Sequence, residues 1–267
     1  MTILRLFATS LAVACSSSAP ARPDVPAPAC RFAVDGDHAT ALRGPIAAPD
    51  PRTATTLVKK GYALDTAGIG RALAADDDPT ALLAALTAVS VQQCRALLPR
   101  VETLLGAPPP TAVEAAATLA ELGTSAQRTR AFAALRIALG DPSWPEVQVT
   151  AAVYLGRAGD SASVPAIRAA LRSANEAVRL QAVVSIAGFE GFDGRDVSGH
   201  RFTRLAELDA VLADPTSSWM VRREAVYQVA RLAMSAERTA VLTRVVEQDT
   251  DARVRRAASL RLGGGSP

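Results

Sequence analysis

The sequence predicts an all-α protein, a solenoid built from stacked antiparallel helix pairs. Two observations predict this fold. First, four ten-residue blocks share a pattern of Val at the first position, Ala four residues later and an aliphatic residue eight later, which places three apolar side chains on one stripe of a helix. Second, these blocks recur at intervals of 31, 43 and 33 residues, about the length of a helix pair, as helical solenoids require. The blocks begin at Val147, Val178, Val221 and Val254.

The composition limits how the core is built and which partners the protein has. The chain has 267 residues and is 49% hydrophobic but only 4% aromatic, so its core must consist mainly of Ala, Leu and Val. Its 29 basic and 26 acidic side chains leave a net charge of +3. This is far from the dense basic stripe that phosphate-backbone binding needs, so we do not expect a nucleic-acid partner.

The N-terminus predicts export. Residues 1–14 combine Arg5, an apolar stretch from Leu6 to Ala14 and small residues before Cys15, which is the organisation of a signal peptide. The stretch is too short to span a bilayer. The residues Leu11–Cys15 resemble the lipobox of bacterial lipoproteins, which implies that Cys15 is acylated and anchors the chain on a membrane, facing the periplasm or the cell surface. Ordinary cleavage after Ala14, giving a soluble secreted protein, is the alternative, and a cytosolic protein with a chance apolar start is a third.

Residues 15–29 are predicted to be a tether. They are rich in Ser, Pro and Ala, which cannot build a core, and Pro favours an extended, solvated chain. In a polyproline conformation of about 3.1 Å per residue, the tether would hold a folded domain about 40 Å from the lipid surface.

The chain has three cysteines, an odd number for an exported protein. If Cys15 is acylated, Cys30 and Cys94 can form a disulfide in an oxidising compartment. The alternative is that Cys94 is a buried free thiol, because it shares an apolar helix face with Val91 and Leu98.

Residues 30–65 are predicted to be an irregular lead-in, and residues 66–267 the solenoid. Helices are predicted at 66–75, 80–89, 91–105, 112–122, 126–139, 146–157, 161–172, 176–187, 202–213, 219–232, 236–248 and 252–262. Caps and helix stops are expected at 76–79, 140–142, Asn175, 214–218 and 249–251. The last block has no helix after it, so it is interpreted as the C-terminal cap.

The four blocks, each paired with a second helix and a polar turn, resemble HEAT repeats, and in particular the short HEAT-like subtype of phycobilisome lyases. The clear units run from Trp144 to Leu262, and residues 111–123 fit more loosely. The resemblance implies a right-handed α-solenoid of about five to six units that acts as a monomeric, non-catalytic scaffold for a protein or peptide partner. It implies no particular reaction.

The longest interval between blocks contains the insertion GFEGFDGRDVSGH at 188–200, and insertions in solenoids form loops on one face, often the binding face. Phe189 and Phe192 are candidate anchors for a partner, and Asp193, Asp196 and His200 are candidate polar contacts that, with a nearby glutamate, could in principle hold a cation. The alternative is a solvated loop whose Phe side chains pack back onto the solenoid. A second functional reading makes this insertion the site of an enzyme or an enzyme-maturation factor, either lyase-like or metal-dependent.

Two recurring residue types are expected to have structural roles. Arg179, Arg222 and Arg255 each follow the first Val of a block, and this fixed register favours bonding across the repeat turn over a ladder that binds an acidic partner. Trp144 and Trp219 begin repeat helices, and in an aromatic-poor chain we expect both to fill seams between units.

No catalytic arrangement is found, and no cofactor or metal is expected. The two histidines, His38 and His200, are isolated and belong to no HExxH motif or nucleophilic triad. The HEAT-like iron hydroxylases that modify a lysine use repeated His-Glu pairs. Here His38 is followed by Ala39 and His200 by Arg201, so we do not expect that activity. The glycines at 68–70 lie inside a predicted helix and therefore do not form a phosphate loop.

Overall fold

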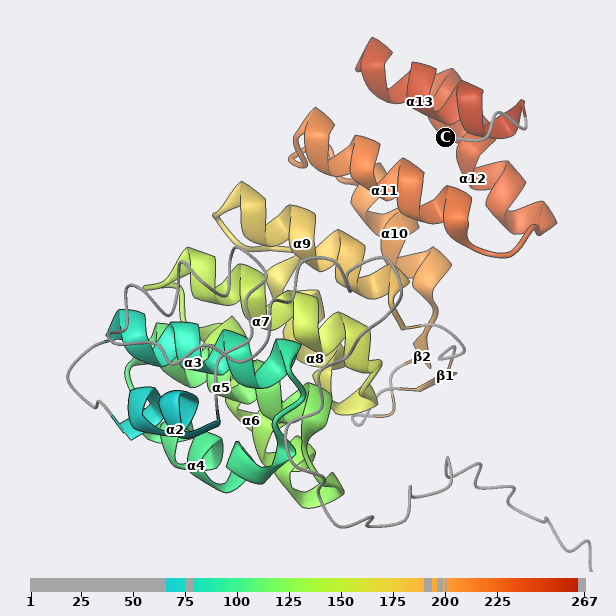
Figure 1. Cartoon of the computed structure of the whole chain (residues 1–267). Coiled ribbons are helices and arrows are strands. Elements are labelled where there is room, and N and C mark those ends of the chain that lie inside the picture. Colours follow the sequence, from blue (N-terminus) through green and yellow to red (C-terminus); the bar gives the residue numbers. More distant parts are fainter. Residues whose placement is uncertain (1–65, 75–78, 190–193, 196–198, 200, 264–267) are drawn as a thin grey trace, which may run out of the picture.

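The computed structural model describes residues 66–74, 79–189, 194–195, 199 and 201–263, and these residues are almost entirely helical (Figure 1). This confirms the all-α, HEAT-like solenoid. The predicted signal peptide, tether and lead-in lie outside the described residues. None of the described helices is both long and apolar enough to cross a membrane.

The helices follow one another with short connections. The first half contains α2 (Thr66–Ala74), α3 (Pro79–Val91), α4 (Leu98–Thr103), α5 (Pro109–Leu122), α6 (Ser125–Gly140) and α7 (Pro145–Ala158), with the 3-10 turns η1 (Arg95–Leu97) and η2 (Leu104–Gly106) on either side of α4. The second half contains η3 (Ser161–Ser163), α8 (Val164–Ala170), α9 (Glu176–Ala187), β1 (Gly194–Arg195), β2 (Arg201–Phe202), α10 (Arg204–Ala213), α11 (Trp219–Arg231), α12 (Ala236–Gln248) and α13 (Ala252–Leu262).

The predicted helices are present to within three residues at each end, except for the one at 91–105, which was wrong. Helix α3 continues through Val91, and Gln93 then adopts a φ of 51°, in the left-handed region that ends a helix. Pro99 lacks a backbone N–H and is suited to the first turn of a helix, so α4 starts afresh there. The segment is therefore three short pieces instead of one helix.

Alternate helices form two layers (Figure 1). In the first, called the close layer, α3, α5, α7, α9, α11 and α13 each pack on the next. The second layer, called the open layer, includes α6, α8, α10 and α12. Successive helices of this layer touch less than those of the close layer, and α10 contacts α12 at few points. Helices in the close layer approach so tightly that a Cβ on Gly156 of α7 would lie 2.7 Å from the Cα of Ser185 on α9. The Ser185 hydroxyl also donates to the Ala152 carbonyl at 2.7 Å.

The apolar stripe of the repeated blocks forms the core. The Val, Ala and aliphatic positions of all four blocks are buried, except for Leu262, which is 38% exposed. Leu262 ends α13, and no further repeat among the described residues covers it. The role of this block as a C-terminal cap stays a prediction.

Polar residues begin the helices as the sequence predicted. The side chain of Asn175 accepts hydrogen bonds from the backbone N–H groups of Ala177 and Val178, at 2.9 and 3.3 Å. Ser218 and Asp251 cap α11 and α13 in the same way. Each satisfies N–H groups that have no partner inside the helix.

The block arginines bond across the repeat turns, which confirms their structural role. Arg179 donates to the carbonyls of Ser173 and Ala174. Arg255 donates in the same register to the carbonyls of Asp249 and Thr250, at 2.7 and 3.1 Å. Arg222 donates to the Ser217 carbonyl and also forms a two-point ion pair with Asp249, at 2.9 and 3.2 Å.

Cations and aromatic rings join α13 to α11. The guanidinium carbon of Arg253 lies 3.7 Å from the centre of the Trp219 ring, and that of Arg261 lies 5.1 Å from the Tyr227 ring. Arg223 lies between the two rings, at 5.3 and 5.5 Å. Trp219 therefore fills a seam between repeats as predicted, whereas Trp144 is 40% exposed.

Candidate functional site

The base of the insertion is a small antiparallel ribbon held against the solenoid. Strands β1 and β2 pair with Gly194 opposite Phe202. Phe189 is fully buried and Phe202 is 1% exposed, and their rings meet edge to face with centres 5.7 Å apart. This aromatic pair fixes the point where the insertion leaves α9 and the point where it enters α10.

Arg168 on α8 connects the ribbon to two helices. Its Nε donates to a carboxylate oxygen of Glu207 on α10 at 2.7 Å, and its Nη2 donates to the Arg201 carbonyl at 3.1 Å. Its guanidinium carbon also lies 5.5 Å from the centre of the Phe202 ring. One cation thus holds β2, α8 and α10 in a fixed arrangement.

The structure places only one of the five predicted partner-binding residues. Phe189 packs inside the protein, which is the alternative the sequence left open for its ring. The other four, Phe192, Asp193, Asp196 and His200, lie outside the described residues. Among the residues that are described, no three His, Cys, Asp or Glu side chains gather as metal ligands would.

Cys94 is fully buried at the turn between α3 and η1. Cys15, the predicted lipidation site, and Cys30, the predicted disulfide partner, lie outside the described residues. Lipidation and pairing both remain predictions.

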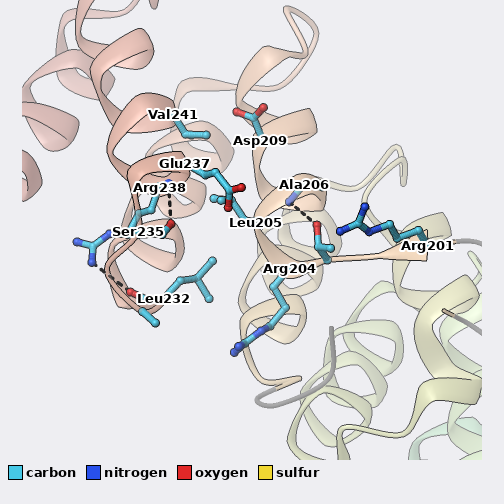
Figure 2. Close-up of a pocket in the computed structure, with 12 residues that line it drawn as sticks. Arg201, Arg204, Leu205, Ala206, Asp209, Leu232, Ser235, Glu237, Arg238 and Val241 are labelled. Atoms are coloured by element: carbon cyan, nitrogen blue, oxygen red, sulfur yellow. Dashed lines mark hydrogen bonds between the residues drawn. The ribbon is translucent and has the colours of Figure 1, made fainter. Parts of the chain in front are cut away.

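A cleft of about 710 Å³ opens between α10 and α12, beside β2 (Figure 2). It exists because these two helices of the open layer contact each other so little. Its apolar lining includes Leu205, Leu232 and Val241. Leu205 shares an apolar face of α10 with the buried Leu208 and Leu212, yet Leu205 is only partly buried, since the neighbouring helix does not cover it.

Charged side chains surround this apolar lining. Arg201 and Arg204 lie on the α10 side of the cleft, and Glu237 and Arg238 lie on the α12 side (Figure 2). Arg238 is mostly buried and donates to the Leu232 carbonyl at 3.1 Å. Asp209 forms an ion pair with Arg244. The cleft therefore pairs an apolar surface with charges of both signs, an arrangement suited to a protein or peptide segment.

The two hydroxyl groups of the lining serve as helix caps. The Thr203 hydroxyl accepts from the Ala206 N–H at 3.2 Å, and the Ser235 hydroxyl accepts from the Arg238 N–H at 3.0 Å. Neither lies beside a histidine, because no described residue is one. The described lining thus offers apolar and charged contacts for binding.

Sequence reasoning pointed to the insertion but missed the cleft next to it. The missing information is the spacing between α10 and α12, which depends on how successive repeats stack. The one signal in the sequence that pointed toward the cleft was the insertion itself, because β2 at its end leads directly into α10.

Comparisons with known proteins agree with the repeat architecture. Residues 97–187 match a family model described as HEAT repeats. A solved structure of human deoxyhypusine hydroxylase in complex with glycerol is 17% identical, covering 80% of this chain and 88% of that chain, with a TM-score of 0.40. No curated protein matches the chain.

Proposed function

Because the chain is a HEAT-like repeat protein, we propose that it is a non-catalytic scaffold that binds another protein at the cleft between α10 and α12. The observation that carries the proposal is the combination of a partly exposed apolar lining with arginines on its edge. Apolar contacts supply most of the affinity in such sites, and charges supply orientation. Strand β2, which Arg168 holds and which follows the predicted binding insertion in the chain, contributes Arg201 to the same cleft.

We place this scaffold in the cell envelope, exported and anchored by a lipid on Cys15, with residues 15–29 as its tether. The support is the signal-like composition of residues 1–14 and the lipobox-like residues before Cys15. Replacing Cys15 with Ser should abolish acylation and release the protein from the membrane fraction. Unchanged membrane association would contradict the anchor, and a soluble periplasmic wild-type protein would favour simple secretion.

Site-specific photocrosslinking tests the binding site. A photoreactive residue at Leu205, inside the cleft, should give a discrete crosslinked partner in cells that make the protein. The same residue at Ile137, which is 76% exposed on α6, is the matched control and should give no such product. Equal products at both positions, or none at Leu205, would contradict a binding cleft here.

The alternative, an enzyme or enzyme-maturation factor with its site in the insertion, has a separate test. Asp193, Asp196 and His200 supply the residue types of a metal site. Stoichiometric metal in the purified protein, lost when these three residues are replaced by Ala, would favour this alternative over the scaffold.

A further inference from the structure

A second hollow of about 390 Å³ lies beside the cleft, across the C-terminal ends of α7, α9 and α11 in the close layer. Arg204 and Leu232 line both the hollow and the cleft. The two spaces are therefore adjacent at these side chains, although they lie mainly on different layers.

The repeat register explains how the hollow forms. Arg157, Gly188 and Arg231 each stand ten residues after the first Val of their block. They occupy equivalent positions in three neighbouring repeats, and the middle position has no side chain. A Cβ at Gly188 would lie 2.7 Å from the Gly156 carbonyl oxygen, so the close approach of α7 and α9 keeps this position bare. Arg157, Gly188 and Arg231 all line the hollow, and Gly188 contributes no side chain to it.

Three arginines line the hollow, and none of the described residues that line it is acidic. Arg204 reaches it from the start of α10 and donates to the Ala187 carbonyl at 3.4 Å. Arg157 lies over the Tyr154 ring, and Arg231 donates to the Gln228 side chain at 3.4 Å. Within the described part of the chain, neither Arg157 nor Arg231 forms an ion pair. Like charges around one space repel each other, and a bound anion converts that repulsion into attraction.

We propose that this arginine hollow, lined by Arg157, Arg204 and Arg231, binds carboxylates of an acidic segment of the partner protein. The inference rests on the proposed function, because the segment is the one that occupies the neighbouring cleft. Because Arg204 and Leu232 line both spaces, a single extended chain that crosses these side chains would place an apolar side chain in the cleft and acidic side chains in the hollow. Guanidinium groups favour this ligand because they bind carboxylates through two parallel hydrogen bonds.

The test measures binding of defined probes to the purified protein by fluorescence anisotropy. The probes are a labelled hexaglutamate peptide and the matching hexaglutamine peptide. The variant is Arg157→Gln/Arg231→Gln. The control is Arg71→Gln/Arg95→Gln, which removes two exposed arginines elsewhere and leaves the net charge equal to that of the variant. Because all four side chains are exposed, both double variants should fold normally, as circular dichroism would verify.

The wild-type protein and the control should bind hexaglutamate and not hexaglutamine, and the Arg157→Gln/Arg231→Gln variant should bind hexaglutamate about tenfold more weakly. Equal weakening in the control, or no hexaglutamate binding by the wild type, would overturn the proposal. So would arginine-dependent binding of inorganic phosphate alone, or of phosphatidylglycerol vesicles alone. If the Leu205 crosslink forms but is unaffected by the double substitution, the scaffold stands and the arginine hollow falls.

Discussion

The three block arginines occupy the same position in their repeats but have different partners, so substituting each of them tests how much each set of contacts stabilises the protein. Arg179 and Arg255 donate only to turn carbonyls among the contacts described, whereas Arg222 also pairs with Asp249. The side chains of Arg222 and Asp249 are 10% and 4% exposed, so this ion pair is buried. Substituting each arginine with Met keeps much of the aliphatic stem and removes the charge.

The expected losses of unfolding free energy differ by mechanism. Arg179→Met and Arg255→Met each remove hydrogen bonds to backbone carbonyls and should cost about 1 kcal/mol. Arg222→Met also leaves a buried carboxylate without its cation and should cost about 3 kcal/mol or more. For a domain of this size these values correspond to decreases in Tm of about 2–4 °C and about 6–12 °C.

Thermal denaturation followed by circular dichroism measures these differences. Adding Asp249→Asn to Arg222→Met removes the uncompensated charge and should recover part of the lost stability, as a double-mutant cycle would show. Equal losses for all three arginines, or no recovery in the double variant, would refute the assignment of a buried ion pair to the Arg222 position.

Three further predictions follow from the structure. Gly156→Ala forces a Cβ into a helix contact with no room for it and should destabilise the protein by about 1–3 kcal/mol in thermal melts, whereas Gly140→Ala, with open space around it, should not. Hydrogen bonds from the side chain and backbone N–H of Arg253 hold the pKa of Asp251 well below its ordinary value of 3.8. The stabilisation from Asp251 is therefore present in full above pH 3.8 and is lost as the pH falls through the folded-state pKa. In thermal melts from pH 7 to pH 2, Asp251→Asn should therefore lose less stability on acidification than the wild type. Arg168→Gln frees the ribbon from α8 and α10 and should speed tryptic cleavage in the insertion, with unchanged cleavage rates counting against its anchoring role.

Local signals predicted the helices well where a cap coincided with the start of an apolar stripe. Asn175, Ser235 and Asp251 each cap a helix, and the helices that follow them have the predicted boundaries. The prediction failed at 91–105, where the apolar pattern continued across a left-handed residue, Gln93, that only the backbone reveals. The spacing of apolar residues indicates which side chains face a core, but it does not show whether they lie on one continuous helix.

The candidate site was less predictable because it depends on distances between repeats. The register of Arg157, Gly188 and Arg231 is visible in the sequence, but the tight approach of α7 and α9 and the hollow beside it are not. Likewise, the pattern places Leu205 on an apolar face without indicating that α12 leaves it partly uncovered. The periodicity of apolar residues describes each helix separately, whereas a cleft depends on the distances between several helices.

The stack of arginines and rings between α11 and α13 has a consequence for how the protein opens. In a solenoid, each unit is stabilised by its neighbours, and among the described helices of the close layer from α7 onward α13 packs on α11 alone, so we expect it to have the lowest free energy of local unfolding of those helices. Backbone amides of α13 should therefore exchange with deuterium fastest among the close-layer helices from α7 onward. The rings of Trp219 and Tyr227, held by Arg253 and Arg261, oppose this fraying at both ends of the helix. If these contacts break, α13 should unfold locally while the cleft and the repeats before it stay folded.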